Sequence, residues 1–144
     1  MREILFRGKA INRDYGCHRT NYKNGDWVYG LVTRLYDERF ENLPAEMTNV
    51  NGIEGIEVDY KTIGQYTGLT DKNGKKIFEG DIIQFCTGMK LHYIVEFGLG
   101  GFMVSRYDIR DAIINVYNCP CEVIGNIHDN PELLKGGAES VSKS

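Results

Sequence analysis

The sequence predicts a mostly β protein built of two small units. Three Asn-Gly dipeptides, at 24–25, 51–52 and 73–74, divide the chain at short intervals, and Asn-Gly accepts the positive φ of tight hairpin turns. Between these turns lie short runs in which apolar side chains alternate with their neighbours, which is the pattern of strands. Seventeen glycines and only three prolines among 144 residues also fit turn-rich β structure better than long helices.

The first clear strand signal is residues 27–32, where both alternating sets of side chains are apolar. Trp27, Tyr29 and Leu31 form one set, and the residues between them form the other, so we expect a strand covered on both faces. The segment 36–50 is largely polar and contains a proline, and we expect an irregular connection there. A boundary between the two units is expected near residues 55–62.

The second half of the chain carries a denser series of strand signals. Residues 93–104 are predicted to form a hairpin around a glycine-rich break. Ile83 and Phe85 share a face after the turn at 79–81, where Asp81 can accept hydrogen bonds from backbone N–H groups. Short strands interrupted this often indicate a small barrel or sandwich.

Two places favour short helices. Apolar residues from Ile109 onward recur at helical spacing, which predicts a helix over 108–117, and Asp108 can cap its first turn. Pro131 follows Asn130, and proline suits the first position of a helix. The sequence therefore predicts a helical turn after Asn130.

Composition argues against several classes of protein. The chain has 17 Lys and Arg against 20 Asp and Glu, a net charge of −3, whereas nucleic-acid coat proteins carry a positive excess. No apolar run approaches the roughly 20 residues that span a bilayer, and the charged start MREILFR is unlike a signal peptide. Four cysteines are too few for a disulfide scaffold of this length, so we expect reduced thiols in a cytosolic protein.

Three blocks of the sequence together resemble one known family. The first joins residues 2–8 to residues 24–30. The second is 63–83, IGQYTGLTDKNGKKIFEGDII, and the third is 122–134, EVIGNIHDNPELL. In order and spacing, these blocks resemble the YopX family of phage and prophage proteins over about residues 2–134.

The resemblance implies a mostly β fold whose C-terminal part is an SH3-like barrel. With the boundary expected above, we predict a small N-terminal β unit, residues 1–60, packed on this barrel, residues 61–135, with at most one or two short helices. The small and polar residues 136–144 predict a flexible tail. A phage or prophage origin is also implied, and hence the cytoplasm of the bacterial host cell. The resemblance implies no reaction, substrate or cofactor, and the blocks can all be explained as turns and caps required for folding.

Three functional hypotheses can be drawn from the sequence, and the weakest is a thiol or metal-dependent enzyme. Cys17 and His18, together with Cys119 and Cys121, would supply four soft ligands for zinc. One residue between two cysteines is a poor spacing for such a site, and a buried free cysteine is the alternative. Cys86 lies in a predicted strand without the motif of a nucleophile elbow. We therefore expect no enzyme, no metal and no cofactor.

Two binding hypotheses remain, and both place binding on exposed side chains. We favour a protein partner or self-association, because tyrosine supplies rigid amphipathic area at interfaces and open barrel edges invite strand addition. The tyrosines in or near turns are Tyr15, Tyr22, Tyr36 and Tyr60. The alternative is single-stranded nucleic-acid binding, which combines cations with aromatic side chains. Its candidate contacts are Lys72, Lys75, Lys76, Arg106 and Arg110.

Overall fold

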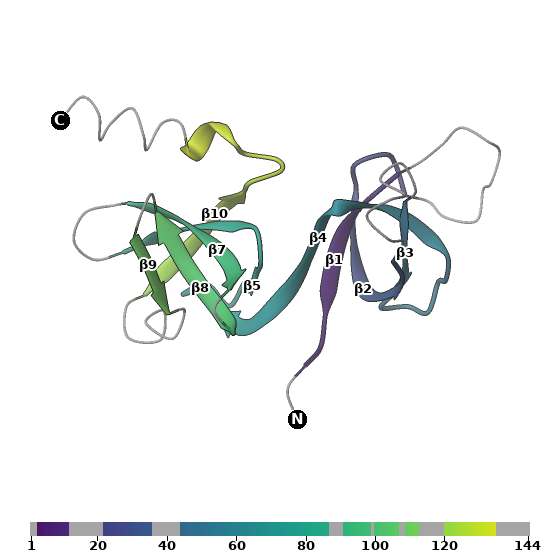
Figure 1. The fold of residues 1–144 in the computed structure, drawn as a ribbon, viewed down its shortest axis with the longest axis horizontal. Helices are drawn as coiled ribbons and strands as arrows, with labels where there is room; N and C mark the ends of the chain where they lie inside the picture. The colour runs from purple at the N-terminus through teal and green to yellow at the C-terminus, as the bar shows by residue number, and fades with distance from the viewer. Residues whose placement is uncertain are drawn as a thin grey trace. The chain divides into compact units, whose positions relative to one another are not determined.

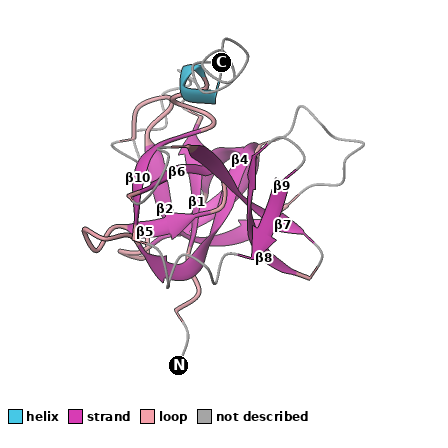
Figure 2. Ribbon diagram, turned by 90° about the vertical axis from the view of Figure 1, so that its left-hand side faces the viewer, coloured by secondary structure: helices cyan, strands magenta, loops and turns pink. Residues whose placement is uncertain are grey.

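The computed structural model describes residues 3–11, 22–35, 44–86, 91–98, 100–106, 109–112 and 120–134. Nearly all regular structure within these ranges is strand (Figure 2), so the prediction of a mostly β chain is confirmed. The chain divides into two compact units, unit 1 (Met1–Tyr66) and unit 2 (Thr67–Ser144). Within the described ranges, no helix has the length and apolar character needed to cross a membrane.

Unit 1 is a closed ring of antiparallel strands. In chain order these are β1 (Phe6–Ala10), β2 (Trp27–Arg34), β3 (Ala45–Asn49) and the first part of β4 (Ile56–Thr70). β1 pairs with both β2 and β4 and so closes the order β1-β2-β3-β4. Closure gives each of these strands a partner on both sides. The core of the unit consists of Ala10, Val28, Ala45, Met47, Ile56 and Val58.

β4 is a strand of 15 residues that continues from unit 1 into unit 2. It pairs with β1 and β3, and further along with β5 (Lys76–Phe78). Figure 1 shows it as one continuous ribbon. Unit 1 ends at Tyr66, inside this strand, six residues beyond residue 60, where the sequence placed the end of the N-terminal unit.

Unit 2 contains an antiparallel sheet in the strand order β10-β6-β7-β8-β9. Its strands are β6 (Asp81–Phe85), β7 (His92–Gly98), β8 (Gly101–Arg106), β9 (Ile109–Ala112) and β10 (Cys121–Asn126). β7 and β8 form the predicted hairpin. The core consists of Ile77, Ile83, Val95, Val104, Cys121 and Val123.

The ring closure among the described strands lies in unit 1, so the SH3-like barrel expected for residues 61–135 stays a prediction. The helical turn expected after Asn130 is confirmed, because residues 132–134 are helical and the N–H of Leu133 donates to the carbonyl of Asn130 at 3.1 Å. The predicted tail, 136–144, lies outside the described residues.

Three predictions of local structure are wrong. Strand β9 lies within the segment 108–117 that was predicted to be a helix, because hydrogen bonding to β8 outweighs the local periodicity. Strand β3 lies within the segment 36–50 that was predicted to be irregular, and it pairs with both β2 and β4. β2 is not covered on both faces, since Tyr29 and Leu31 are 38% and 50% exposed.

Candidate binding surfaces

The turn before β6 is built around the buried side chain of Asp81, which is 1% exposed. Its Oδ2 accepts a hydrogen bond from the backbone N–H of Phe78 at 2.8 Å. Gly80, in the same turn, has a φ of 92°, a conformation that favours glycine. The predicted hydrogen bond from backbone to aspartate is confirmed, and it accounts for this part of the second block by folding alone.

The turn after β10 is held by two asparagine side chains. Asn126 Oδ1 accepts the N–H groups of His128 at 3.0 Å and of Asp129 at 2.9 Å. Asn130 Oδ1 in turn accepts the N–H of Asn126 at 3.2 Å. Gly125 lies directly against Asn130, because a Cβ added at Gly125 would be 2.5 Å from that same Oδ1. The third block is therefore also explained by turn geometry.

We expect Gly125→Ala to lower the free energy of unfolding by about 1–3 kcal/mol. The added methyl group displaces the Asn130 side chain and breaks its bond to the N–H of Asn126. Urea unfolding measures the effect. Truncating the Asn130 side chain to alanine also removes the clash. The double variant Gly125→Ala, Asn130→Ala is therefore expected to lose less free energy of unfolding than the sum of the losses in the two single variants. Strict additivity would contradict the contact.

The turn at 71–76 presents lysines around a buried aspartate. Asp71 is 7% exposed. Its Oδ1 accepts the N–H groups of Asn73 at 2.8 Å and Lys75 at 2.9 Å, and its Oδ2 accepts the N–H of Val123 at 3.0 Å. Burial acts to raise the pKa of Asp71, but these hydrogen bonds and the charge of Lys75 together lower it below its ordinary value. The carboxylate therefore anchors the turn to β10.

The three lysines of this turn differ in exposure. Lys72 and Lys75 are exposed and Lys76 is half-buried. Lys72 Nζ lies 3.7 Å from Glu122 Oε2, and both side chains are 43% exposed. Electrostatic attraction to Cys86 and Glu122 raises the pKa of Lys72. An exposed ion pair of this kind contributes little stability, yet it places the carboxylate of Glu122, on β10, beside the lysines of the turn.

The two arginines of the nucleic-acid hypothesis lie elsewhere in unit 2, on the β8–β9 hairpin. Arg106 ends β8 and is half-buried, and Arg110 on β9 pairs with Ser105. Tyr107, an aromatic residue that lies between them in the sequence, is outside the described residues. The five predicted nucleic-acid contacts are thus drawn from two separate structural elements, one turn and one hairpin.

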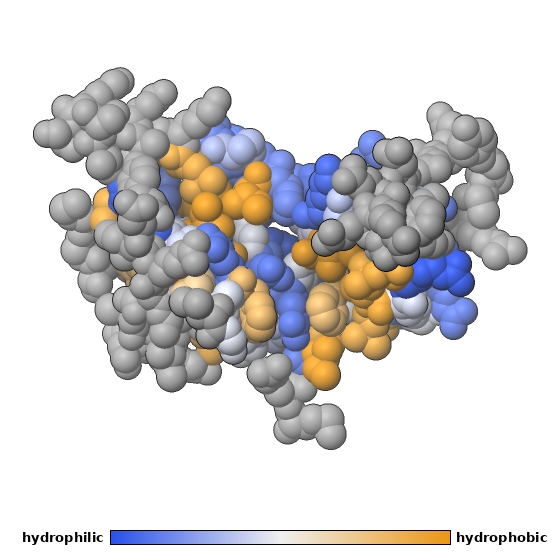
Figure 3. Space-filling model, viewed as in Figure 1, coloured by the Kyte–Doolittle hydropathy of each residue, from blue (hydrophilic) through white to orange (hydrophobic). Residues whose placement is uncertain are grey.

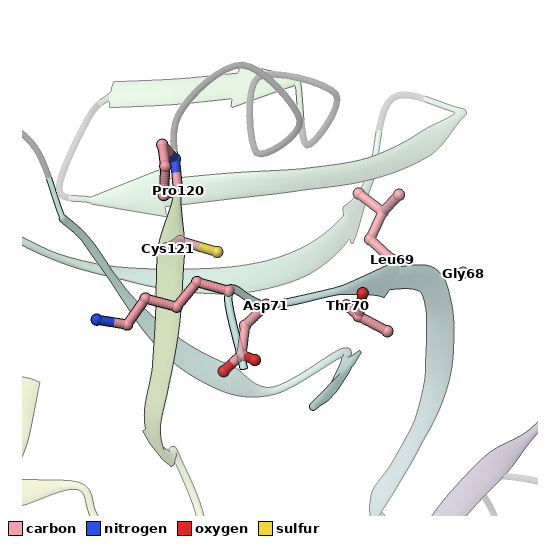
Figure 4. Close-up of a pocket in the computed structure, with 7 residues that line it drawn as sticks. Gly68, Leu69, Thr70, Asp71, Pro120 and Cys121 are labelled. Carbon is pink, nitrogen blue, oxygen red and sulfur yellow. The ribbon is translucent and has the colours of Figure 1, made fainter. Parts of the chain in front are cut away.

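A hollow of about 260 Å³ opens beside the turn at 71–76 (Figure 4). The backbone N–H of Lys72 donates to the carbonyl of Cys121 at 2.9 Å, which joins the turn to β10 here. Burial, together with the nearby charges, raises the pKa of the Cys121 thiol to about 11, so the thiol stays protonated and forms an apolar wall. The volume suits one side chain better than a cofactor. The lining residues are Gly68, Leu69, Thr70, Asp71, Lys72, Pro120 and Cys121.

Metal ligands are not gathered in the part of the chain that the structure describes: no group of three or more His, Cys, Asp or Glu side chains there could hold a metal ion. Cys121 is a buried free thiol and Cys86 an exposed one. Cys17, His18 and Cys119 lie outside the described residues, so the zinc hypothesis is left open.

The tyrosines predicted as partner contacts occupy different environments. Tyr22 packs against the core of unit 1, and its hydroxyl accepts a hydrogen bond from Asn49 Nδ2 at 3.1 Å. Tyr60 is 39% exposed, and Lys61 Nζ lies 6.0 Å from the centre of its ring. Tyr15 and Tyr36 lie outside the described residues.

An exposed apolar surface that sequence reasoning missed lies on the outer face of β2. Tyr29 and Leu31 are two positions apart on β2 and project from the same face. Val50, just beyond β3, is 68% exposed. The N–H of Val50 donates to the carbonyl of Tyr29 at 2.9 Å, which continues the β2–β3 ladder, so Val50 stands beside Tyr29. Figure 3 shows hydrophobic side chains exposed on unit 1. We call this set, with Ile53 of the following turn, the β2 surface: Tyr29, Leu31, Val50 and Ile53.

Two cations border the β2 surface at Trp27. Arg7 Cζ lies 4.5 Å and Lys9 Nζ 5.4 Å from the centre of the indole ring. The register of β1 with β2 places Lys9 opposite Trp27 and Arg7 opposite Tyr29. Cation–π attraction favours this arrangement. In the sequence, Arg7 and Lys9 are two positions apart, so both would project from the same face of a strand. The sequence does not show which strand lies beside them.

A comparison with protein families identifies the chain. The family model described as YopX protein matches residues 12–135, which is most of the sequence. The chain belongs to the YopX family. The predicted resemblance is therefore confirmed, and the YopX match contains the second and third blocks in full.

This YopX chain is also similar to a solved structure, the crystal structure of protein EF1440 from Enterococcus faecalis. The two share 27% sequence identity, with a TM-score of 0.53, over 92% of this chain and 98% of the other. No curated protein matches the sequence.

Proposed function

We propose that this YopX protein is a non-catalytic binding module that engages a protein partner through the β2 surface. The observation that carries the proposal is the adjacency of exposed apolar side chains in unit 1: Tyr29, Leu31, Val50 and Ile53 are 38%, 50%, 68% and 40% exposed. Covering such side chains contributes about 25 cal/mol per Å² of apolar surface removed from water. Single exposed apolar residues are common, whereas adjacent ones mark interaction sites.

The partner in this proposal is another protein or a second copy of the chain. A phage or prophage accessory role in the bacterial cytoplasm is part of the proposal, and membership of the YopX family supports it. Tyr60 is a further candidate contact, since its exposure is similar to that of Tyr29. Tyr22 is a weaker one, because its ring and hydroxyl are engaged within unit 1.

Single-stranded nucleic-acid binding is the second candidate function. The gathering of Lys72, Lys75 and Lys76 in one turn supports it. The ion pair between Lys72 and Glu122 and the net charge of −3 weigh against it. This function requires an affinity that falls steeply with salt concentration.

Leu31→Glu is expected to abolish partner capture, because a carboxylate would have to be buried unpaired in the interface. The measurement is a pull-down with the tagged chain from phage-infected bacterial lysate, with and without nuclease, in parallel with sedimentation. We expect the wild-type chain to retain one discrete protein in both lanes, or to sediment above the monomer mass of 16.4 kDa. We expect Leu31→Glu to lose that protein by tenfold or more, which corresponds to about 1.4 kcal/mol.

Phe97→Glu is the matched control, since Phe97 is 56% exposed and lies on β7 in unit 2. It introduces the same charge on an equally exposed apolar site and should leave capture unchanged. Equal capture by the wild-type and Leu31→Glu chains would refute the role of the β2 surface. Capture that disappears with nuclease, and is lost when Lys75 and Lys76 become Glu, would favour the nucleic-acid function instead.

A further inference from the structure

We propose that Asn51 is a site of spontaneous deamidation, and that the product weakens partner binding at the β2 surface. Asn51 and Gly52 are exposed and lie between Val50 and Ile53, two members of this surface. Asparagine is chemically labile, and glycine has no Cβ to shield the backbone nitrogen that attacks it. The effect on binding rests on the proposed function, whereas the reaction itself does not.

The reaction needs only the chain and water. The Gly52 nitrogen bonds to the side-chain carbonyl carbon of Asn51, giving a cyclic imide. The bond from that carbon to the amide nitrogen breaks, and this nitrogen takes up the proton released by Gly52 and leaves as ammonia. Water then opens the ring at either carbonyl, which yields aspartate or isoaspartate. Both products carry a carboxylate at position 51, and isoaspartate also lengthens the main chain by a carbon atom.

The turn at 49–53 has the same backbone hydrogen bonds as the turn at 71–75, which contains another Asn-Gly pair. In each turn the N–H of the glycine donates to the carbonyl of the first residue, at 2.9 Å for Gly52 and 3.0 Å for Gly74. Both glycines have positive φ, 85° and 80°. The glycine nitrogen is therefore engaged in both turns, and it attacks the asparagine only when the turn opens locally.

The two turns differ in the side chain that anchors them. Oδ1 of the first residue accepts two N–H groups of its own turn, at 3.0 and 2.9 Å for Asn49 and at 2.8 and 2.9 Å for Asp71. Asn49 Nδ2 also donates to the hydroxyl of Tyr22 at 3.1 Å, and Asp71 Oδ2 also accepts the N–H of Val123. Hydrogen bonds to a charged acceptor are roughly twice as strong as neutral ones. The turn with the neutral anchor, Asn49, therefore opens more readily.

The third Asn-Gly pair, Asn24 and Gly25, is held by a strand pair. The N–H of Gly25 donates to the carbonyl of Ala10 at 2.8 Å, and the N–H of Ala10 donates to the carbonyl of Asp26 at 2.8 Å. Ala10 is buried and also pairs with β4. Freeing the Gly25 nitrogen requires this buried end of the ladder to open, so we expect Asn24 to react more slowly than Asn51.

Peptide mapping by mass spectrometry tests the site. The full chain is incubated in mildly alkaline buffer, either folded or in guanidinium chloride, and deamidation is followed at all three Asn-Gly pairs. Dividing the folded rate by the unfolded rate removes the effect of neighbouring sequence. We expect this ratio to be about tenfold higher at Asn51 than at Asn73 or Asn24, because a neutral anchor replaces a charged one or a ladder. A ratio at Asn51 that is equal to or below the other two would overturn the inference.

Asn49→Asp tests the anchor. It gives the turn at 49–53 the carboxylate anchor of the other turn, and the Tyr22 hydroxyl can donate to that carboxylate. We expect the rate at Asn51 to fall by about tenfold, with the rate at Asn24 unchanged as the internal control. An undiminished rate at Asn51 in the folded variant would contradict the role of Asn49.

Asp71→Asn makes the reciprocal change and keeps the test decisive if Asn49→Asp does not fold. It leaves the turn at 71–75 with a neutral anchor and should raise the rate at Asn73. Circular dichroism checks that each variant is folded at the temperature of incubation. A folded Asp71→Asn chain in which Asn73 reacts no faster than in the wild-type chain would also count against the inference.

Asn51→Asp carries the charge of the product and tests the effect on binding. In the pull-down from phage-infected lysate, we expect it to lose the partner by about tenfold, because a partner covering the β2 surface must remove the carboxylate from water. Asn73→Asp makes the same change in the other turn and should keep capture. Wild-type capture by Asn51→Asp, while Leu31→Glu loses the partner, would overturn the inference and leave the proposed function intact. Capture that neither variant changes would refute the proposed function, and the deamidation rates would be unaffected.

Discussion

Gly30→Ala is expected to unfold unit 1, or at least to lower its free energy of unfolding by about 3–5 kcal/mol. A Cβ at Gly30 would lie 1.9 Å from the carbonyl oxygen of Thr48 and 2.8 Å from the Cα of Asn49. Both are backbone atoms of the β2–β3 contact, so neither can rotate away as a side chain could. Relief of the clash requires β2 and β3 to separate, which opens the ring.

Chemical denaturation measures this effect, and the fluorescence of Trp27, the only tryptophan of the chain, reports on unit 1. Gly101→Ala is the control, because a Cβ at Gly101 would meet nothing within 4 Å. We expect its unfolding midpoint to stay close to that of the wild-type chain. A wild-type midpoint for Gly30→Ala would contradict the close approach of the two backbones.

Asp71→Asn is expected to lower the free energy of unfolding of unit 2 by about 2–3 kcal/mol. The carboxylate accepts three backbone N–H groups, from Asn73, Lys75 and Val123. An asparagine amide can accept at its oxygen, but its NH₂ group would then face an N–H donor. At least one N–H group loses its acceptor, and an amide that keeps its oxygen toward Asn73 and Lys75 gives up the bond to Val123 on β10.

The carboxylate of Asp71 also predicts how the stability of the fold depends on pH. The pKa of Asp71 is lowered in the folded chain, so the unfolded chain binds this proton more readily. The stability contributed by the ionised carboxylate is complete above the unfolded pKa of about 3.9 and is lost as pH falls through the folded pKa. The difference between the wild-type and Asp71→Asn chains should therefore be full at neutral pH and should shrink in acid.

Urea unfolding at neutral and at acid pH tests this prediction. Asp26→Asn is the control, because Asp26 is exposed and its carboxylate accepts an exposed backbone hydrogen bond from the N–H of Lys23 at 2.8 Å. Its effect should be small at either pH. A wild-type advantage over Asp71→Asn that persists undiminished in strong acid would show that ionisation of Asp71 does not stabilise the fold.

Turn chemistry was predictable because it depends on residues only a few positions apart. The glycines of the three Asn-Gly dipeptides all have positive φ, at 91° for Gly25, 85° for Gly52 and 80° for Gly74. Asp81 bonds a backbone N–H three positions away. These features follow from the short reach of the side chains and from the freedom of glycine at φ > 0.

Strand partners were not predictable in the same way. The helical spacing that begins at Ile109 is present in the sequence, yet the described part of that segment is β9, because β8 offers it a hydrogen-bonding partner. The exposure of Tyr29 and Leu31 was equally hidden, since both faces of β2 carry apolar side chains. Which face is buried depends on the register with β1 and β3, where a shift of one residue exchanges the two faces.

The amino-acid sequence by itself determined the β class, the turns and the membership of the YopX family, because each depends on local residue types or on motifs read along the chain. Only the tertiary structure decided that Arg7 and Lys9 meet Trp27, and that Asp71 bonds Val123 across 52 positions. Antiparallel pairing joins segments that are distant in the chain. The register of a whole sheet, rather than any single segment, therefore selects the side chains that form a binding surface.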